Sequence, residues 1–456
     1  MTFASINPAT GEEIGRTAAL TEGQLSARLR GCDEAQRRWE AVGIAGRAEL
    51  VSRLAAHLRS EQERYARLIT TEMGKPVRES RAELEKCAWA AAYYAEEAAA
   101  WLAPVTVETA ALRSEVHYRP LGLVLGIMPW NFPFWQVFRF AVPTLLAGNG
   151  VLVKHAPSVQ GCAAAIAACF EKAGFPPGLC TNLPITVGQV EQVVADPAVQ
   201  AVTLTGSGRA GRSVAALAGG YLKMTVLELG GSDPFVVLAD ADLDRAVDTC
   251  LRSRLVNTGQ SCIGAKRIIV SRPLYDSFRD RLAKRLSCLV VGDPAAETSD
   301  IGPMAGLVYR ETLHRQVQES VRLGARCLTG GTVPEGPGAY YPPTLLVDVR
   351  PDMPAWQEEL FGPVFVLVQA DDEAHAIQLA NDTPYGLGAT IFTGDKDKGY
   401  DMACRELAAG SCFVNAMVRS DPRLPFGGIR HSGYGRELSV EGIRTFTNIK
   451  TVWLEA

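Results

Sequence analysis

The stretch Ala201-Val202-Thr203-Leu204-Thr205-Gly206-Ser207-Gly208-Arg209-Ala210-Gly211 joins an apolar strand to the start of a helix. Its second half has the pattern G-x-G-x-x-G, which leaves backbone N–H groups at a helix terminus where they can hold a phosphate. A tight turn alone accounts for the same glycines. The stretch therefore predicts a strand–turn–helix unit and leaves open whether the turn binds a ligand.

Similar strands stand on both sides of this unit. The apolar runs that we interpret as strands are residues 121–127, 150–154, 225–229 and 235–238, and a helix is expected over residues 159–173. Continuous Val- and Leu-rich strands separated by helices are typical of parallel sheets with both faces covered. The sequence therefore predicts an α/β protein with a doubly wound parallel sheet.

After Asp240 the alternation of helices and strands begins again. Helices are expected over residues 243–256, 274–289, 309–323 and 374–381, and strands over residues 267–270 and 365–368. This pattern predicts a second α/β domain. A chain of 456 residues is also longer than one hydrophobic core usually supports.

The chain up to residue 102 is predicted to be helical. Thr21 with Gln24 three residues later is a capping-box pattern ahead of a helix that reaches residue 42. Further helices are expected over residues 45–73 and 78–102. Residues 103–119 contain two short β-prone runs around a polar turn, which predicts a hairpin.

The composition excludes several classes of protein. A net charge of −4, with 47% hydrophobic and 21% charged residues, is ordinary for a globular protein and gives no sign of nucleic-acid binding. The N-terminus has no basic segment followed by an apolar one, and three prolines interrupt the uncharged residues 120–138. Eleven cysteines without a C-x-x-C pair predict neither a metal site nor a disulfide framework. We expect a cytoplasmic protein without a membrane segment or metal.

Glu228 stands in the apolar stretch Leu227-Glu228-Leu229-Gly230-Gly231. Burying an ionised carboxylate is expensive. The residue is therefore either paired with a basic group for structural reasons or held with a raised pKa for catalysis. The spacing alone does not choose between these interpretations.

Cys262 stands in the loop Asn257-Thr258-Gly259-Gln260-Ser261-Cys262-Ile263-Gly264. Small neighbours on both sides suit a nucleophile that a substrate must reach, whereas many lone cysteines are only small buried hydrophobes. An ordinary thiol is only a few per cent thiolate near pH 7, so a nucleophilic cysteine needs a base or positive surroundings. No histidine lies in a comparable loop, which disfavours a papain-like hydrolase.

Over essentially its whole length the chain resembles the aldehyde dehydrogenase superfamily, and within it the bacterial succinate-semialdehyde dehydrogenases. The stretches that carry the resemblance stand in the family's order: 129–133 (PWNFP), 154–158 (KHAPS), 206–211, 228–231 (ELGG), 259–262 (GQSC), 358–363 (EELFGP), 381–387 and 424–428 (LPFGG).

The resemblance implies catalytic roles for three residues. Cys262 would attack the aldehyde carbon, and Asn131 would help to stabilise the resulting oxyanion. After hydride transfer to the nicotinamide, Glu228 would deprotonate the water that hydrolyses the thioester.

The resemblance also implies the cofactor, which would be NAD or NADP. Lys154 would reach the adenosine ribose, Ser207 would face the pyrophosphate, and Glu359 would bind the nicotinamide ribose with Phe361 beside the ring. The further residues of the implied cofactor site are Met128, Trp130, Gly206, Gly211 and Leu229.

Pro157 bears on the choice between NAD and NADP. Family members restricted to NAD often carry a glutamate at this position, where it repels a 2′-phosphate. Pro157 offers no charge, so the chain lacks that device. We expect NADP to be accepted alongside NAD.

The same resemblance implies a domain organisation. Residues 1–102 and 120–230 would form the dinucleotide-binding domain and residues 231–430 the catalytic domain. Residues 103–119 and 431–456 would be oligomerisation segments of a homodimer or homotetramer.

Succinate semialdehyde is the expected substrate, with Arg139 binding its far carboxylate and Phe132, Trp135 and Phe426 forming apolar walls. Arg139 could equally belong to a structural ion pair on a helix. A second arginine that some related enzymes carry is replaced by Val256, for which Arg419 or Arg423 could substitute. Another small aliphatic aldehyde, or a cysteine hydrolase or esterase activity, remain as alternatives.

Overall fold

The strands around the opening stretch form one sheet in the computed structural model, which describes residues 1–455. Its parallel strands are β5 (Leu123–Met128), β6 (Gly150–His155), β7 (Cys180–Asn182), β8 (Val199–Thr205) and β9 (Met224–Glu228). They lie in the order β7-β6-β5-β8-β9, with β17 (Gly433–Tyr434) antiparallel on the outer edge of β9. The chain order reverses between β5 and β8, which is where ligands bind in doubly wound sheets.

Helices cover both faces of this sheet, because successive side chains of a strand point to opposite faces. Val151 and Val153 of β6 pack in one cluster with α2 to α6, whereas Leu152 packs in another with α1, α7 and α8. The helices are α1 (Glu22–Glu40), α2 (Ile44–Ser60), α3 (Gln62–Met73), α4 (Val77–Trp101), α5 (Trp135–Leu146), α6 (Gln160–Lys172), α7 (Val190–Ala195) and α8 (Gly208–Gly220), with the short 3-10 turns η1 (Pro157–Val159) and η2 (Val187–Gln189). The predicted doubly wound sheet is confirmed.

The N-terminal segment corrects the expectation of an entirely helical start. Strands β1 (Thr2–Ile6) and β2 (Glu13–Ala18) form an antiparallel hairpin before α1. The predicted capping box of Thr21 and Gln24 is present at the start of α1. The helix predicted over residues 45–73 is broken into α2 and α3 at Glu61, whose φ of −106° and ψ of 13° are not helical.

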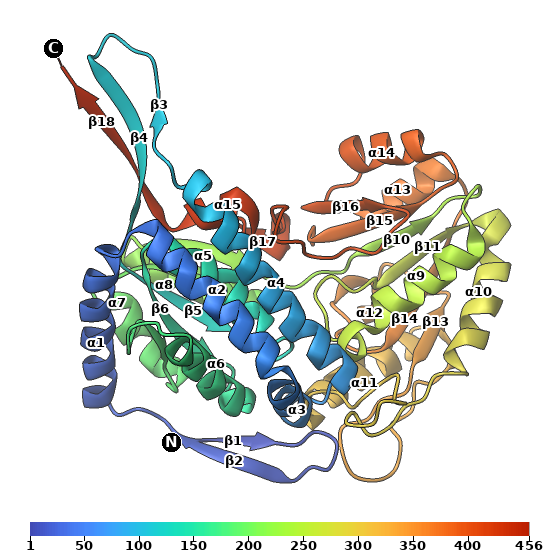
Figure 1. Ribbon diagram of the computed structural model, residues 1–456. Helices are drawn as coiled ribbons and strands as arrows, with labels where there is room; N and C mark the ends of the chain where they lie inside the picture. Colours follow the sequence, from blue (N-terminus) through green and yellow to red (C-terminus); the bar gives the residue numbers. More distant parts are fainter. Residues whose placement is uncertain (456) are drawn as a thin grey trace.

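A second α/β domain is also confirmed, but it begins before Asp240, because the strand predicted at residues 235–238 for the first sheet is a strand of the second one. Its sheet has the order β12-β13-β14-β11-β10-β15-β16, parallel except for the β12–β13 pair. The strands are β10 (Pro234–Val237), β11 (Arg267–Ser271), β12 (Arg326–Thr329), β13 (Thr344–Val347), β14 (Val364–Ala370), β15 (Gly388–Phe392) and β16 (Ser411–Val414). Figure 1 shows this sheet and its helices beside the first domain.

The helices of the second domain pack on both faces of its sheet. Those are α9 (Leu243–Leu255), α10 (Arg272–Leu286), α11 (Leu307–Arg322), α12 (Pro354–Gln357), α13 (Glu373–Asn381) and α14 (Lys396–Arg405), with η3 (Val256–Gly259) directly after α9. Helices α9 and α10 cover one face at Phe235 and Val237, and α13 and α14 cover the other at Val236. Strands β12, β13, β15 and β16 and helices α12 and α14 were not predicted.

A small sheet of β3 (Val105–Thr106), β4 (Arg113–Pro120) and β18 (Thr447–Leu454) projects from the first domain (Figure 1). The predicted hairpin of residues 103–119 is thus present, and the C-terminal strand pairs with it. The segment between them returns to the first domain, where η4 (Arg430–Ser432) leads into β17 and α15 (Ser439–Thr445) packs against α4 and α5. Across residues 1–455, no helix combines the length and apolar character that crossing a membrane requires.

Candidate active site

The loop that carries Cys262 lies between η3 and β11 and has a constrained backbone. Asn257 and Thr258 have φ angles of 57° and 56°, in the left-handed region that non-glycine residues rarely adopt. Gly259 follows with φ 74°, and a Cβ there would collide with the carbonyl of Gly362. Such conformations persist only where the surrounding contacts hold them, as at many functional sites.

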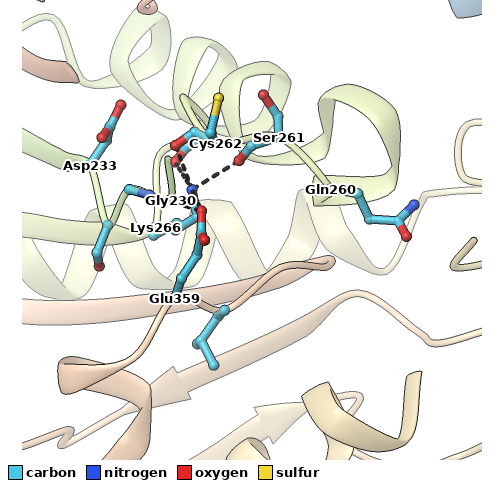
Figure 2. Close-up of polar contacts among 12 residues, drawn as sticks. Gly230, Asp233, Gln260, Ser261, Cys262, Lys266 and Glu359 are labelled. Carbon is cyan, nitrogen blue, oxygen red and sulfur yellow. Dashed lines mark hydrogen bonds and ion pairs between the residues drawn. The ribbon is translucent and has the colours of Figure 1, made fainter. Parts of the chain in front are cut away.

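Lys266 holds this loop from the second domain's sheet. Its ammonium donates to the carbonyl oxygens of Ser261 at 2.9 Å and Cys262 at 2.7 Å, and lies 3.4 Å from Glu359 Oε1. The same Glu359 oxygen accepts the backbone N–H of Gly231 at 3.0 Å. Figure 2 shows this cluster, with the Cys262 sulfur pointing away from the lysine. Lys266 therefore ties the predicted nucleophile to the predicted cofactor carboxylate.

A buried guanidinium ties the same two loops together a second time. Arg254 donates to the carbonyls of Gly259 at 3.1 Å, Leu360 at 2.6 Å and Val364 at 2.6 Å. Each of these acceptors is a backbone oxygen, so the arginine fixes chain geometry and takes no part in chemistry. It sets the spacing between the Cys262 loop and the loop of Glu359 and Phe361.

Cys262 is half-buried in this loop. Burial raises the pKa of Cys262 to about 12, and the positive charge of Lys266 opposes the shift. A thiol with so high a pKa is not ionised near neutral pH, so proton transfer must accompany its attack on a substrate.

Asn131 lies where the resemblance predicts an oxyanion-binding side chain. Its Nδ2 donates to the carbonyl of Gln260 at 3.1 Å, two residues before Cys262. Asn257 Nδ2 in turn donates to the carbonyl of Asn131 at 2.7 Å. The amide is therefore fixed beside the nucleophile's loop.

A cleft of about 740 Å³ opens onto Cys262. The predicted substrate residues Phe132, Trp135, Arg139 and Phe426 all contribute to its lining. Arg419 also lines the cleft, whereas Arg423 pairs with Asp421 at 2.7 Å and packs over the ring of Trp89. The cleft is thus an aromatic passage that ends at a thiol.

A fully buried ion pair positions the aromatic wall of this cleft. Glu83 accepts the backbone N–H groups of Phe134 at 2.8 Å and Trp135 at 3.0 Å, at the start of α5. Lys75 donates to the other oxygen of Glu83 at 2.5 Å and lies 3.9 Å over the ring of Phe132. A carboxylate at a helix N-terminus is stabilised by the helix dipole, so α4 fixes where α5 begins.

Glu228 ends β9 and is 2% exposed. Within the described part of the chain, neither of its carboxylate oxygens has a hydrogen-bond partner. Burial raises its pKa well above the usual range, Arg139 lowers it and Glu437 raises it further. An unbonded buried carboxyl with a raised pKa is a feature of catalytic acids and bases.

Arg139 is 3% exposed and is already paired. Its guanidinium forms an ion pair with Glu437 and donates to Thr205 Oγ1 at 3.2 Å. Its Cζ also lies 4.9 Å from the centre of the Phe426 ring. Of the two interpretations of Arg139, the ion pair within the protein is present, and Glu437 already balances its charge.

The predicted cofactor residues of the first domain lie along one edge of its sheet. Met128, Lys154 and Leu229 stand at or just after the carboxyl ends of β5, β6 and β9, which run parallel. Gly206 and Ser207 connect β8 to α8, and Ser207 Oγ caps the helix by accepting the N–H of Ala210 at 3.3 Å.

These residues fit a dinucleotide. Lys154 is buried, burial lowers its pKa, and in the described residues its ammonium has no hydrogen bond or ion pair. The first turn of α8 offers N–H groups to a phosphate. Gly211 has a packing role, because a Cβ there would lie 2.6 Å from Leu229.

The residues predicted near the nicotinamide also meet. The rings of Trp130 and Phe361 pack edge to face with centroids 5.8 Å apart, and the ring of Tyr309 packs at a tilt of 35° with its centroid 4.4 Å from that of Trp130. Glu359 stands two residues before Phe361, in the cluster of Figure 2.

Sequence reasoning missed Lys266, Arg254 and Glu437. Lys266 and Arg254 stand within eight residues of Cys262 in the printed sequence, so charged residues so close to the nucleophile were the available signal. Glu437 has no comparable signal, because it is far from both Glu228 and Arg139 along the chain. Its position follows from β17 pairing with β9.

Comparisons with known proteins match this geometry. The model of the Aldehyde dehydrogenase family matches residues 1–452. A Synechocystis protein named "Probable succinate-semialdehyde dehydrogenase", with NADP(+) in its name, is 46% identical, with all of both chains covered. The Escherichia coli protein named succinate semialdehyde dehydrogenase, with NAD(P)+ in its name, is also 46% identical, covering 98% of this chain and 97% of its own.

Solved structures extend the similarity to the fold. Succinic semialdehyde dehydrogenase from Streptococcus pyogenes in complex with NADP+ has a TM-score of 0.97 and is 35% identical, with both chains fully covered. The structure of Gox0499 has a TM-score of 0.98 and is 39% identical over the whole of both chains.

Proposed function

This chain belongs to the aldehyde dehydrogenase family, and we propose that it oxidises succinate semialdehyde to succinate with NADP or NAD. The observation that carries the proposal is the aromatic cleft that ends at Cys262. Asn131 stands beside the Cys262 loop, and the buried Glu228, whose oxygens accept no hydrogen bond in the described residues, lies near enough to Arg139 for that charge to act on its pKa.

The first half of the reaction belongs to Cys262. Its sulfur attacks the aldehyde carbon, and the thiol proton passes to a water molecule in the cleft as the bond forms. The new oxyanion is stabilised by Asn131 Nδ2, which releases the carbonyl of Gln260, and by the backbone N–H of Cys262. The bound nicotinamide supplies the chemistry of hydride acceptance. Lys266 keeps the loop fixed while the acyl group forms on the sulfur.

The second half belongs to Glu228. An acyl group on Cys262 leaves as a carboxylic acid when a water attacks its carbonyl carbon. Glu228 takes the proton of that water, and its raised pKa makes it a stronger base than an ordinary carboxylate. The absence of a hydrogen bond to either oxygen within the described residues leaves both free to accept the proton.

Lys154 and the start of α8 would hold the cofactor, with Glu359 toward the nicotinamide ribose. Pro157 is exposed at the start of η1, three residues beyond Lys154, and brings no negative charge toward a 2′-phosphate. Both relatives named here carry NADP(+) or NAD(P)+ in their names. Competition titration should show NADP bound alongside NAD, and a preference for NAD above about a thousandfold, or ~4 kcal/mol, would contradict it.

The substrate assignment rests on the relatives and on the cleft. Both curated relatives are named for succinate semialdehyde, and Phe132, Trp135 and Phe426 narrow the passage to the thiol. The role of Arg139 in substrate binding stays a prediction, because its charge is shared with Glu437.

An absorbance assay of reduced nicotinamide tests the proposal directly. Wild-type protein should oxidise succinate semialdehyde with a kcat/KM above that for butanal, by about tenfold or more. A preference for butanal would leave the family's reaction in place and overturn the substrate. Turnover of esters without any reduction of nicotinamide would favour the hydrolase alternative.

We also propose a cytoplasmic homo-oligomer. The eleven cysteines, which all lie in the described residues, are free thiols, as expected in a reducing compartment. Ile449 and Trp453 of β18 are 65% and 51% exposed, and apolar side chains on a projecting strand suit a contact between copies. Light scattering of the purified protein measures the number of copies.

A further inference from the structure

We propose that the ammonium of Lys86 binds the far carboxylate of the aldehyde substrate, an inference that rests on the function proposed above. Lys86 lies on the face of α4 that lines the cleft, one turn after Glu83. It therefore shares the passage that leads to Cys262.

The surroundings of Lys86 are those of a carboxylate-binding subsite. Its Nζ lies 4.3 Å from the centre of the Trp135 ring and donates to Ser420 Oγ at 2.6 Å. Trp135 and Ser420 also line the cleft. A substrate carboxylate placed here would meet an ammonium and a hydroxyl, above an aromatic wall that excludes water on one side.

Lys86 differs from most other cations of the cleft because no carboxylate balances it. Arg139 is paired with Glu437, Arg78 with Asp300 at 2.9 Å, and Arg285 with Asp248. The acidic groups near Lys86 are committed elsewhere, Glu83 to Lys75 and Asp421 to Arg423. Within residues 1–455 Lys86 forms no ion pair.

Two other cations at the cleft, Arg252 and Arg419, are exposed to solvent. Water and salt screen exposed charges strongly, so each adds little to the binding of a carboxylate. The ammonium of Lys86 is half-buried and is the cation from which a bound carboxylate gains most.

Burial lowers the pKa of Lys86 to about 8, and Arg139 contributes to the same shift. The side chain is therefore a cation below about pH 8 and neutral above it. Of the other groups that face it, the pKa of Cys87 is raised well above its usual range by burial, and the hydrogen bond from Arg423 lowers the pKa of Asp421. Neither titrates near the pKa of Lys86.

Substitution of Lys86 tests the inference with two aldehydes. Lys86→Met keeps the stem that packs on Trp135 and removes the charge. It should lower kcat/KM for succinate semialdehyde by about tenfold or more, mainly by raising KM. The kcat/KM for butanal should change by less than about twofold. Lys86→Arg should restore most of the loss. Arg285→Gln, which removes a paired charge from the rim, is the matched control and should leave the ratio of the two substrates unchanged.

The wild-type protein gives a second readout that needs no variant. The ratio of kcat/KM for succinate semialdehyde to that for butanal should fall as pH rises through about 8, the pKa of Lys86. Titrations of the catalytic groups affect both substrates and cancel in this ratio. The carboxylate of the substrate is ionised throughout.

The outcomes separate this inference from the proposed function. If the wild-type protein shows no preference for succinate semialdehyde, the proposed substrate is wrong. If the wild-type preference exists but Lys86→Met keeps it, Lys86 is not the partner of the carboxylate. The same conclusion follows if kcat/KM for both substrates falls by the same factor in the variant. A substrate ratio that stays flat with pH would overturn the inference as well.

Discussion

The loop of Cys262 and the end of strand β9 at Glu228 differ in how their polar groups are hydrogen-bonded. Lys266 and Arg254 donate to the carbonyls of Gly259, Ser261 and Cys262 around the nucleophile. Glu228 is equally enclosed by the protein, yet within residues 1–455 its two oxygens accept no hydrogen bond.

The difference matches what each residue has to do. A nucleophile gains from a fixed position, because the attack on an aldehyde depends on distance and angle. A general base gains from a raised pKa and from oxygens free to take a proton. Hydrogen bonds hold the backbone at Cys262 in place, whereas the side chain of Glu228 accepts none within the described residues.

Loss of the nucleophile should have the largest effect. Cys262→Ala removes the proposed nucleophile of the cleft and should lower aldehyde oxidation by about a thousandfold or more. Cofactor affinity should be nearly unchanged, because the alanine keeps the backbone contacts of Lys266. Steady-state rates and fluorescence titration with NADPH check both parts. Cys404→Ala, at an exposed cysteine of α14, is the control; residual activity above about one per cent of wild type in Cys262→Ala would refute the role.

Removal of the lysine that holds the Cys262 loop should reduce activity by a smaller factor. Lys266→Met removes the ammonium donor from the carbonyls of Ser261 and Cys262 and the cation that lies beside Glu359. We expect kcat/KM to fall by about 10- to 100-fold, since small misplacements of a reacting group have effects of that size, and NADP binding to weaken. The exposed Lys284→Met on α10 should behave as wild type. Unchanged kinetics in Lys266→Met would show that the loop keeps its shape without the lysine.

Removal of the charge of Glu437, near the proposed base Glu228, should have the smallest effect. It should shift the pH dependence of acyl-enzyme hydrolysis. The negative charge of Glu437 contributes to the raised pKa of Glu228, after burial. Glu437→Gln removes that charge and frees Arg139, and both changes lower the pKa of Glu228. Because Glu228 acts as a base only when ionised, hydrolysis of the acyl enzyme should begin to rise at a lower pH than in wild type. Stopped-flow measurements across pH test this, with Glu441→Gln on α15 as control; a shift to higher pH would contradict the account.

Much of the fold was predictable because apolar runs and glycines encode it locally. The parallel strands of the first sheet and the capping box at Thr21 were found in this way. The hairpin of β1 and β2 was missed because its strands are short and mostly exposed. The break at Glu61 was missed because it changes the backbone at a single residue, and residues 45–73 contain no proline and no internal glycine after Gly46 to mark it.

The site was predictable as a set of residues but not as a set of partners. The sequence marked Cys262, Glu228 and Arg139 as unusual. It could not show that Arg139 pairs with Glu437, because that contact depends on how the chain returns after the second domain. The ion pair of Lys75 and Glu83 was equally hidden, since a charge in the loop before a helix and another on that helix, eight residues apart, usually face solvent.

The central claim, a fixed nucleophile served by an unbonded base, is tested most directly by Glu228→Gln mixed with succinate semialdehyde and NADP. The amide keeps the shape of the side chain but cannot take a proton from water. We expect one equivalent of NADPH in a fast phase, then steady turnover reduced by about 10²- to 10⁴-fold. Intact-mass measurement should show the acyl group of the substrate on the protein, and peptide mapping should locate it on Cys262. An unmodified protein that turns over at the wild-type rate would contradict the account.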